Sequence, residues 1–366
     1  MEASERLVTG HVDIDPMWRG GQRQAFLLAT GLAAHGHPTH FFTAPETPLA
    51  GQLADTPVRV HAVPTWGEWD PFAARRLARE ANEAGVQVLA AHSAHAHGLA
   101  VLAQAFGLRA AVVVHRRVDN PIRRGFFNDR KYAAPRHFIA IGEAVRAALM
   151  SAAVPAEKIS VVSSGVPPHE PVAGAKAALA AACGIDAGVP WVGDVAGLVD
   201  HKGHAHLLDA WPRVRADIDA ALILIGDGPR RSALEQHARV LNISDSVHFV
   251  GWRDDVPAWL SALDVFAMTS VTEGLCSAIL DAMAARVPVV ATAAGGIPEL
   301  VIDDQTGRLA AVADPADIAA KLRLALTDRD RAAALAAAAY ETVWRDRSAD
   351  RMVERTAAIY RGLLSV

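Results

Sequence analysis

The sequence predicts an α/β protein built from two doubly wound, parallel-sheet domains. Its 366 residues exceed what one hydrophobic core usually holds. Short β-branched or apolar runs alternate with Ala-rich helical stretches, and this alternation restarts after a segment rich in Pro and Gly at residues 163–174. Strands that are apolar throughout are typical of parallel sheets with helices on both faces, so we expect one such sheet in each half.

The first half contains strand-like runs separated mostly by helical patterns. These runs lie within residues 6–14, 38–44, 58–64, 86–93, 110–116, 137–142 and 159–166. Between the first two, the stretch QRQAFLLATGLAAHG at residues 22–36 has apolar side chains at intervals of three and four, which predicts a helix. We therefore predict a first domain over residues 1–168.

The second half repeats the same rhythm. Its strand-like runs lie within residues 190–198, 220–228, 247–252, 264–270 and 287–293. Pro and Gly mark a linker near Pro167 to Val172, so we predict a second domain over residues 169–347. The remaining stretch, residues 348–366, has the pattern of an amphipathic helix.

Composition excludes several classes of protein. Hydrophobic residues make up 51% and charged residues 21%, as in ordinary globular chains, and no apolar run reaches the roughly 18 residues of a membrane span. The start, MEASERLVTGHV, lacks the pattern of a secretory signal, so we expect a cytoplasmic protein. Cys183 and Cys276 cannot form a disulfide framework and lack the clustered partners of a zinc site. A net charge of -4 argues against general nucleic-acid binding.

Ligands of doubly wound sheets bind beyond the carboxyl ends of the strands, so the loops there carry the functional signals. Gly20 and Gly21 lead into a helix and would let backbone N–H groups approach an anion, although a tight turn is the alternative. Lys202 follows a strand and can hold a phosphate. Gly226 and Gly228 in LIGDGP allow close backbone approach, or again only a turn. No dinucleotide fingerprint or P-loop motif occurs.

The stretch EGLCSAILD carries an acid at each end, Glu273 and Asp281. Eight helical residues rise about 12 Å, so the two carboxylates serve different atoms. If a helix starts near Cys276 or Ser277, the N–H groups of residues 275–278 form an anion site. A pyrophosphate there, with sugar hydroxyls on Glu273 and ribose hydroxyls on Asp281, would explain both acids. In the alternative, Glu273 favours the helix dipole and Asp281 is solvated.

Several motifs together resemble the family 4 retaining glycosyltransferases of GT-B fold, over nearly the whole chain. They are RGGQR, LAAHGH, VVVH, GLVDHKGH, LILIGDGP, VHFVGWRDDVP and the long block TEGLCSAILDAMAARVPVVATAAGGIPELVIDDQTGRL. The resemblance implies two Rossmann-like domains facing a cleft. It implies that the first domain binds the acceptor, that the second binds the nucleotide-sugar, and that the helix at about 348–366 packs back on the first.

The resemblance also implies the chemistry and the residues that carry it. The activity would be metal-independent, hexosyltransferase-type transfer with retention, from a UDP-, GDP- or ADP-sugar to a glycan, lipid-linked or lipopolysaccharide-type acceptor in cell-envelope biosynthesis, with no cofactor. Lys202 would hold the pyrophosphate, Glu273 the donor sugar and Asp281 the ribose, and His115 would lie at the reacting end of the donor. The other donor-binding residues are Gly20, Gly21, Gly226, Gly228, Gly251, Arg253, Gly274, Leu275, Cys276 and Ser277.

Two departures from the family pattern keep other functions open. Asp281 stands where the family has a glutamate, and Gly197 stands where it usually has an arginine ahead of the lysine. Arginines of other loops are candidates to replace that cation: Arg116, Arg117, Arg230 and Arg253. The alternatives to an active transferase are a non-catalytic nucleotide-sugar-binding protein and, more remotely, a GT-B epimerase.

Histidine clusters and a basic segment have several interpretations. His92, His95 and His97, like His201, His204 and His206, could be zinc ligands, polar core residues or, for His92 and His97, acceptor contacts. Asp13 and Asp15 in DID are a further candidate metal site. The segment from Arg109 to Arg136 is either a solvated face or a surface for an anionic acceptor or the inner face of the membrane; its basic residues include Arg116, Arg117, Arg123, Arg124, Arg130 and Lys131. The donor base and sugar, the acceptor, the linkage and the oligomeric state stay open.

Overall fold

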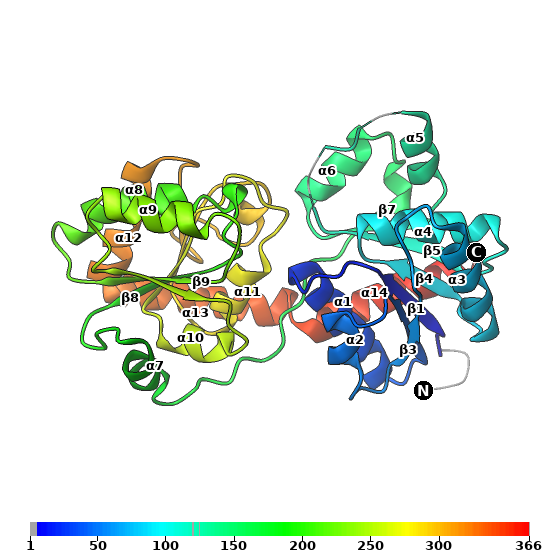
Figure 1. Ribbon diagram of the computed structural model, residues 1–366, viewed down its shortest axis with the longest axis horizontal. Helices are drawn as coiled ribbons and strands as arrows, with labels where there is room; N and C mark the ends of the chain where they lie inside the picture. Colours follow the sequence, from blue (N-terminus) through cyan, green and yellow to red (C-terminus); the bar gives the residue numbers. More distant parts are fainter. Residues whose placement is uncertain (1–5, 119–120, 124, 366) are drawn as a thin grey trace. The chain divides into compact units, whose positions relative to one another are not determined.

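A computed structural model describes residues 6–118, 121–123 and 125–365. The chain divides into an N-terminal unit, Met1–Pro167 with Arg347–Val366, and a C-terminal unit, Pro168–Asp346 (Figure 1). Arg124 of the basic segment lies outside the described residues. The two units are described separately below.

In the described part of the N-terminal unit, seven strands form one parallel sheet in the order β3-β2-β1-β4-β5-β6-β7. The strands are β1 (Thr9–Asp13), β2 (Thr39–Thr43), β3 (Arg59–Ala62), β4 (Val88–Ala91), β5 (Ala111–Arg116), β6 (His137–Ala140) and β7 (Ile159–Val161). The order reverses direction between β1 and β4, which makes the carboxyl ends of these two strands the switch point of the sheet.

Helices connect the parallel strands by crossovers. They are α1 (Gly20–Ala34), α2 (Pro48–Leu53), α3 (Pro71–Glu83), α4 (Ala94–Ala105), α5 (Phe126–Ala133), α6 (Glu143–Ser151) and the 3₁₀ turn η2 (Ala156–Lys158). Right-handed crossovers that run in opposite directions from the switch point place their helices on opposite faces. Helix α1 accordingly contacts α2, whereas α3 contacts α4.

The last helix, α14 (Ala349–Leu364), belongs to the N-terminal unit and packs along α1 (Figure 1). Close packing is possible at Gly31, where a Cβ atom would lie 2.5 Å from Cγ2 of Val353. Met352, Val353, Ala357 and Tyr360 are buried in one core cluster with residues of α1, β4, β5 and β6. This apolar face explains the amphipathic pattern of the chain end.

The C-terminal unit contains a six-stranded parallel sheet in the order β10-β9-β8-β11-β12-β13, counted over the described residues. Its strands are β8 (Trp191–Val195), β9 (Ala221–Ile225), β10 (Val247–Gly251), β11 (Val265–Met268), β12 (Val289–Thr292) and β13 (Arg308–Ala310). Its helices are α7 (Ala175–Cys183), α8 (His204–Arg215), α9 (Arg231–Val240), α10 (Val256–Ala262), α11 (Ser277–Ala284), α12 (Pro315–Thr327) and α13 (Arg329–Asp346), with 3₁₀ turns η3 (Asp200–Lys202) and η4 (Ile297–Glu299).

Three fully buried tryptophans anchor the C-terminal unit, and each has a partner for its indole N–H. Trp191 donates to the carbonyl of Asp186 at 2.8 Å, Trp211 to Oγ of Ser246 at 3.1 Å and Trp259 to Oδ1 of Asp255 at 3.1 Å. Burial of a large indole is stabilising when its polar atom is satisfied, so these side chains fix the frame on which the loops of this unit are held.

The predicted fold class is confirmed. Each of the predicted runs contains one observed strand, and both sheets are parallel. Strand β13 was not predicted, because its three residues, RLA, form no apolar run of recognisable length. Among the helices that the structure describes, none combines the length and the hydropathy that a membrane span requires.

Candidate functional site

The switch point of the C-terminal sheet lies between β8 and β11, and the loops that follow these two strands touch each other. The N–H of Val271 donates to the carbonyl of His201 at 2.8 Å. Oγ1 of Thr269 donates to the carbonyl of Gly203 at 3.1 Å. The crevice beyond such strand ends is where doubly wound folds bind ligands.

The predicted residues Lys202 and Glu273 meet at this point. Nζ of Lys202 lies 2.5 Å from Oε2 of Glu273, which also accepts a hydrogen bond from Oγ of Ser270 at 3.2 Å. Both side chains are largely buried, at 18% and 15% exposed. Burial lowers the pKa of Lys202, but the charges that Cys276, Glu273 and Asp194 can carry outweigh it, so the net pKa lies above its ordinary value. Lys202 therefore keeps its positive charge at neutral pH.

Close backbone contacts place these two side chains. Gly203 has φ +68°, and a Cβ atom there would lie 1.9 Å from the carbonyl oxygen of Thr269. Gly295 has φ +51°, and its Cβ atom would lie 1.9 Å from the carbonyl oxygen of Glu273. Only glycine fits both positions, so the loop that carries Lys202 and the turn after β12 close against the loop that carries Glu273.

Helix α11 begins at Ser277, within the range that the sequence predicted. Cys276 precedes it with φ 68°, and within the described chain no side chain caps this end and no acid lies in its first turn. The free N–H groups and the helix dipole make this end a binding position for an anion. Gly274, Leu275 and Cys276 are buried, and burial raises the pKa of the Cys276 thiol to about 12.

Asp281 lies just over one turn inside α11, partly buried. Its carboxylate acts on His169: burial lowers the pKa of that histidine, and the charge of Asp281 opposes the effect. Glu273 thus lies in the loop before α11 and Asp281 within the helix, the order that the sequence predicted.

Four more of the predicted donor-binding residues lie at or just after the ends of β9 and β10: Gly226, Gly228, Gly251 and Arg253. A Cβ atom on Gly226 would lie 2.0 Å from the carbonyl oxygen of Ala196, and one on Gly228 would lie 2.5 Å from that of Leu198, so this turn packs on the loop after β8. Gly251 ends β10. The guanidinium of Arg253 holds Asp255 through hydrogen bonds of 2.8 and 2.7 Å.

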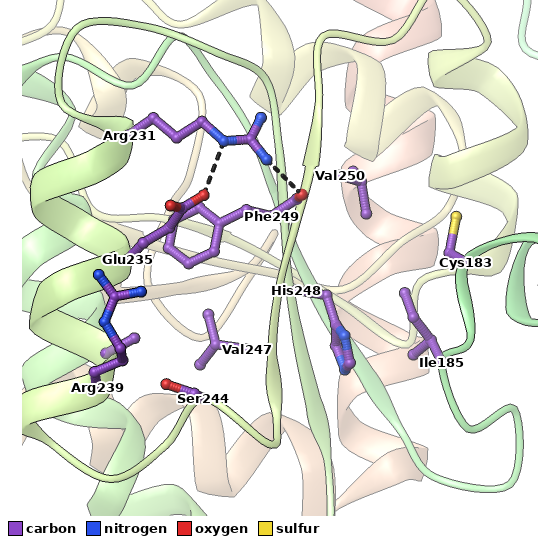
Figure 2. A pocket seen from close by; sticks show the side chains of 11 residues that line it. Cys183, Ile185, Arg231, Glu235, Arg239, Ser244, Val247, His248, Phe249 and Val250 are labelled. Carbon is purple, nitrogen blue, oxygen red and sulfur yellow. Dashed lines mark hydrogen bonds and ion pairs between the residues drawn. The ribbon is translucent and has the colours of Figure 1, made fainter.

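A pocket of about 500 Å³ lies beside β10 (Figure 2). Residues of α9, β10 and the segment from Cys183 to Ile185 line it. Arg231 bridges two of these elements, since its Nε donates to Glu235 at 2.9 Å and its Nη2 donates to the carbonyl of Phe249 at 3.1 Å (Figure 2). Arg231 thereby anchors the end of β10, where Gly251 is the last residue and Arg253 follows two residues later.

The sequence named His204 as a zinc ligand or polar core residue, but it did not single out the buried acid that pairs with this histidine and interacts with Lys202. Asp194, in β8, and His204, at the start of α8, are 0% and 2% exposed, and Oδ2 of Asp194 lies 3.3 Å from Nε2 of His204. Burial raises the pKa of Asp194 to about 7, with Lys202 opposing and Glu273 adding to the rise. Burial, Lys202 and His201 lower the pKa of His204 to about 4. A charged residue inside the apolar run WVGDVAGL was the available signal.

In the N-terminal unit, His115 lies in a buried cluster of polar and aromatic side chains. Its Nε2 lies 2.7 Å from the hydroxyl oxygen of Tyr360 on α14, and the centre of its ring lies 4.7 Å from the ring centre of His92. Nδ1 of His92 lies 3.2 Å from Nη2 of Arg117, and its Nε2 lies 2.9 Å from Nδ1 of His11. Since arginine only donates, His92 carries its proton on Nε2 and donates to His11. Burial lowers the pKa of His115 and of His92 well below the ordinary value, so both rings are neutral.

Gly20 and Gly21 open α1, where within the described residues no side chain caps the helix. A Cβ atom on Gly21 would lie 3.6 Å from Cδ of Arg117, so this helix end and Arg117 are neighbours. The DID motif is explained locally, because Asp13 accepts from Gln22 and from the N–H of Asp15, both at 3.0 Å. Over the described residues, no group of three or more His, Cys, Asp or Glu side chains is arranged to hold a metal ion.

Both units match known family models. Residues 18–170 match the model described as Glycosyltransferase Family 4, and residues 188–328 match the model described as Glycosyl transferases group 1.

Two curated relatives illustrate the similarity in sequence. A GDP-mannose-dependent α-(1-6)-phosphatidylinositol monomannoside mannosyltransferase of Mycobacterium tuberculosis is 38% identical over 178 residues, 45% of this chain and 46% of that protein. The lipopolysaccharide core biosynthesis glycosyltransferase LpsE of Rhizobium meliloti is 32% identical over 157 residues, 43% of this chain and 45% of that protein. The chain thus spans about half the length of the curated relatives it matches.

The fold similarity covers both units. HepE of Anabaena, solved in complex with UDP and glucose, superimposes with a TM-score of 0.85 at 21% identity, covering 99% of this chain and 100% of that one. This likeness shows the fold, two Rossmann-like domains of the GT-B type. With both halves matched by the family's models, the chain belongs to the family 4 glycosyltransferases of GT-B fold.

Proposed function

We propose that the protein is a retaining glycosyltransferase that moves a sugar from a nucleotide-sugar to a glycan, lipid-linked or lipopolysaccharide-type acceptor. One observation carries the proposal: Lys202, Glu273 and the uncapped N-terminus of α11 converge at the switch point of the C-terminal sheet. A cation, a carboxylate and an anion-binding helix end suit the two parts of a nucleotide-sugar, its diphosphate and its sugar hydroxyls.

Departure of the nucleoside diphosphate is the step that these groups assist. Negative charge grows on the phosphate oxygen as the sugar–phosphate bond breaks, and donors already aimed at it lower the barrier. Lys202 and the N–H groups at the start of α11 are such donors. In the proposed route the acceptor attacks the face from which the diphosphate leaves, and the departing phosphate oxygen takes the acceptor proton. This route requires no nucleophile from the protein and no metal.

A second cation on the diphosphate is proposed from the loop after β9. Gly197 leaves the position of the family's arginine without a side chain. Arg230 lies beside the same loop, because its N–H donates to the carbonyl of Leu198 at 3.0 Å and its Nε lies 3.0 Å from Oδ1 of Asp200. Both arginines pair with an acid, but Arg230 makes a single contact with Asp200, whereas Arg253 is held by two hydrogen bonds to Asp255. Arg230 is therefore the replacement that we favour in this unit.

The similar proteins support both a nucleotide-sugar donor and a lipid-linked or lipopolysaccharide-type acceptor. HepE was solved with UDP and glucose, and the Mycobacterium tuberculosis relative uses GDP-mannose and a phosphatidylinositol-based acceptor. LpsE acts in lipopolysaccharide core biosynthesis. For this chain we propose a cytoplasmic enzyme that needs no cofactor and works on an acceptor at the inner face of the membrane.

A donor screen tests the proposal. Calorimetric titration with UDP-, GDP- and ADP-sugars should find one donor that binds, and the purified protein should hydrolyse that donor slowly without an acceptor. Binding without hydrolysis or transfer would instead identify a non-catalytic nucleotide-sugar-binding protein, the alternative that Gly197 and Asp281 left open. Conversion of the donor to an epimer would identify the second alternative.

The two acids should make separable contributions. Glu273→Gln should lower turnover and weaken discrimination among donor sugars, because Glu273 faces the sugar end. Asp281→Asn should chiefly weaken binding of the free nucleoside diphosphate, because this acid faces the ribose end. Titration of each variant with the diphosphate alone measures the difference, about tenfold if one hydrogen bond to a charged group is lost. Equal losses in both variants would contradict this division of labour.

A further inference from the structure

Five aromatic side chains of the N-terminal unit are unusually exposed: Trp66, Trp69, Phe72, Phe126 and Phe127. We call them the aromatic surface. Among the described residues, the large apolar side chains that are at least 65% exposed are Phe72, Phe127, Trp66, Val240 and Phe126, so four of these five belong to this surface. Exposed apolar groups concentrated in one region mark an interaction site, whereas single ones scattered over a protein do not.

Specific contacts bring the two halves of the aromatic surface together. Trp66 and Trp69 lie in the loop before α3, and Phe126 and Phe127 begin α5. Glu68 of the loop forms an ion pair with Lys131 of α5, and Nζ of Lys131 lies 5.9 Å from the ring centre of Trp69. Phe127 precedes Lys131 by four residues and therefore lies on the same side of α5.

The loop is also held in a defined shape. Oδ1 of the buried Asp70 accepts from the N–H groups of Phe72 and Ala73 at 2.9 and 3.1 Å, and its Oδ2 accepts from the N–H of Trp66 at 3.3 Å. On α4, Gly98 leaves room for Glu68, since a Cβ atom there would lie 2.5 Å from its Oε2. The aromatic rings are thus presented to solvent by an ordered support.

Positive charge accompanies the aromatic rings. The guanidinium of Arg130 lies 4.5 Å from the ring centre of Phe126, and Arg75 is exposed one turn after Phe72 on α3. Arg123 is exposed just before α5. Glu68 is paired with Lys131, Asp70 is buried as the helix cap, and Asp129 of α5 accepts from the backbone N–H of Gly125 at 3.4 Å. The two acids at the far end of α3 pair with arginines of the same helix, Glu80 with Arg76 and Glu83 with Arg79. The aromatic surface therefore combines apolar rings with arginines.

We propose that the aromatic surface binds the face of an anionic lipid bilayer. Aromatic side chains partition into the interface between headgroups and acyl chains, and arginines beside them are attracted to anionic lipids. A second copy of this chain fits less well, because a twofold contact through the same surface would bring like-charged arginines together. The inference rests on the proposed function in one respect: it would hold the domain proposed to bind the acceptor against the membrane that contains a lipid-linked acceptor.

Vesicle sedimentation of the full chain tests the proposal. The protein should sediment with vesicles of phosphatidylcholine and phosphatidylglycerol more than with phosphatidylcholine alone. The double variant Phe126→Ser/Phe127→Ser, in α5, should bind these vesicles about tenfold more weakly than the wild type. The double variant Trp66→Ser/Phe72→Ser, in the loop before α3 and in α3, should show the same loss. Val240→Ser is the matched control, because Val240 is 66% exposed in the C-terminal unit, and its binding should equal that of the wild type.

Two further measurements make the outcome decisive. Thermal unfolding of each variant should match the wild type, since the four replaced side chains are largely exposed. Donor binding by the variants, measured by titration, should also be unchanged. If the wild-type protein binds vesicles but no nucleotide-sugar, the proposed function is wrong and this inference still holds. Wild-type binding by both double variants, or no binding by the wild type, would overturn the inference. So would a dimer in light scattering that these substitutions dissociate.

Discussion

Lys202→Ala should lower donor turnover by about two to three orders of magnitude, the usual effect of losing one donor that stabilises developing charge. The structure gives two reasons to expect an effect at the upper end of this range. The ammonium group is largely buried beside Glu273, so solvent screens it little. Gly197 provides no side chain at the position where the family carries a second cation. Single-turnover hydrolysis of the donor identified in the screen measures the loss.

Gly197→Arg supplies a matched gain-of-function control. A Cβ atom on Gly197 would meet the carbonyl oxygen of Asp227 at 3.8 Å, an ordinary contact, so a side chain fits there. In the Lys202→Ala protein, the added Gly197→Arg substitution should raise donor turnover about tenfold over Lys202→Ala alone, because it returns positive charge to the diphosphate. Thermal unfolding must show that both variants fold. A folded Lys202→Ala protein that turns over donor at the wild-type rate would remove Lys202 from the diphosphate site.

Asp194→Asn should change how stability depends on pH. In the unfolded chain an aspartate titrates near pH 4, whereas burial raises the pKa of Asp194 to about 7. Between these values the folded protein holds a proton that the unfolded chain has lost, so the free energy of unfolding falls as pH rises. This contribution is fully present below about pH 4 and is lost as pH passes 7. The asparagine of the variant does not titrate. The free energy of unfolding of the variant, relative to that of the wild type, should therefore be about 2–3 kcal/mol higher at pH 8 than at pH 5.

Denaturant unfolding of both proteins at pH 5 and pH 8 checks this expectation. His204, whose pKa burial lowers to about 4, titrates in both proteins, so its effect largely cancels in the comparison. Asp219→Asn is a suitable control, because this exposed acid belongs to the same unit and pairs with Arg215 on the surface. A stability difference that is the same at both pH values would show that Asp194 stays ionised in the folded protein.

The fold was readable from sequence because its signals are local. Each predicted strand lies within a short, mostly apolar run, and the start of α11 follows from the glycine and small residues around Cys276. Strand β13 escaped because three residues carry too little pattern. The return of α14 to the first domain came only from the resemblance, since amphipathicity shows that a helix has an apolar face but not which surface covers that face.

The alternation of strands and helices, the family motifs and the residue types that can bind phosphate and hydroxyl groups are all legible in the amino-acid sequence. Which of these residues meet depends on the folded chain: Lys202 and Glu273 are 71 residues apart yet share a 2.5 Å contact. The structure likewise shows that Nε2 of His115 contacts the hydroxyl of Tyr360 and that Asp194 is buried beside a histidine. Such contacts escape a reading of the sequence because a parallel sheet brings together the carboxyl ends of strands distant in the chain, and burial there sets the charge of each group.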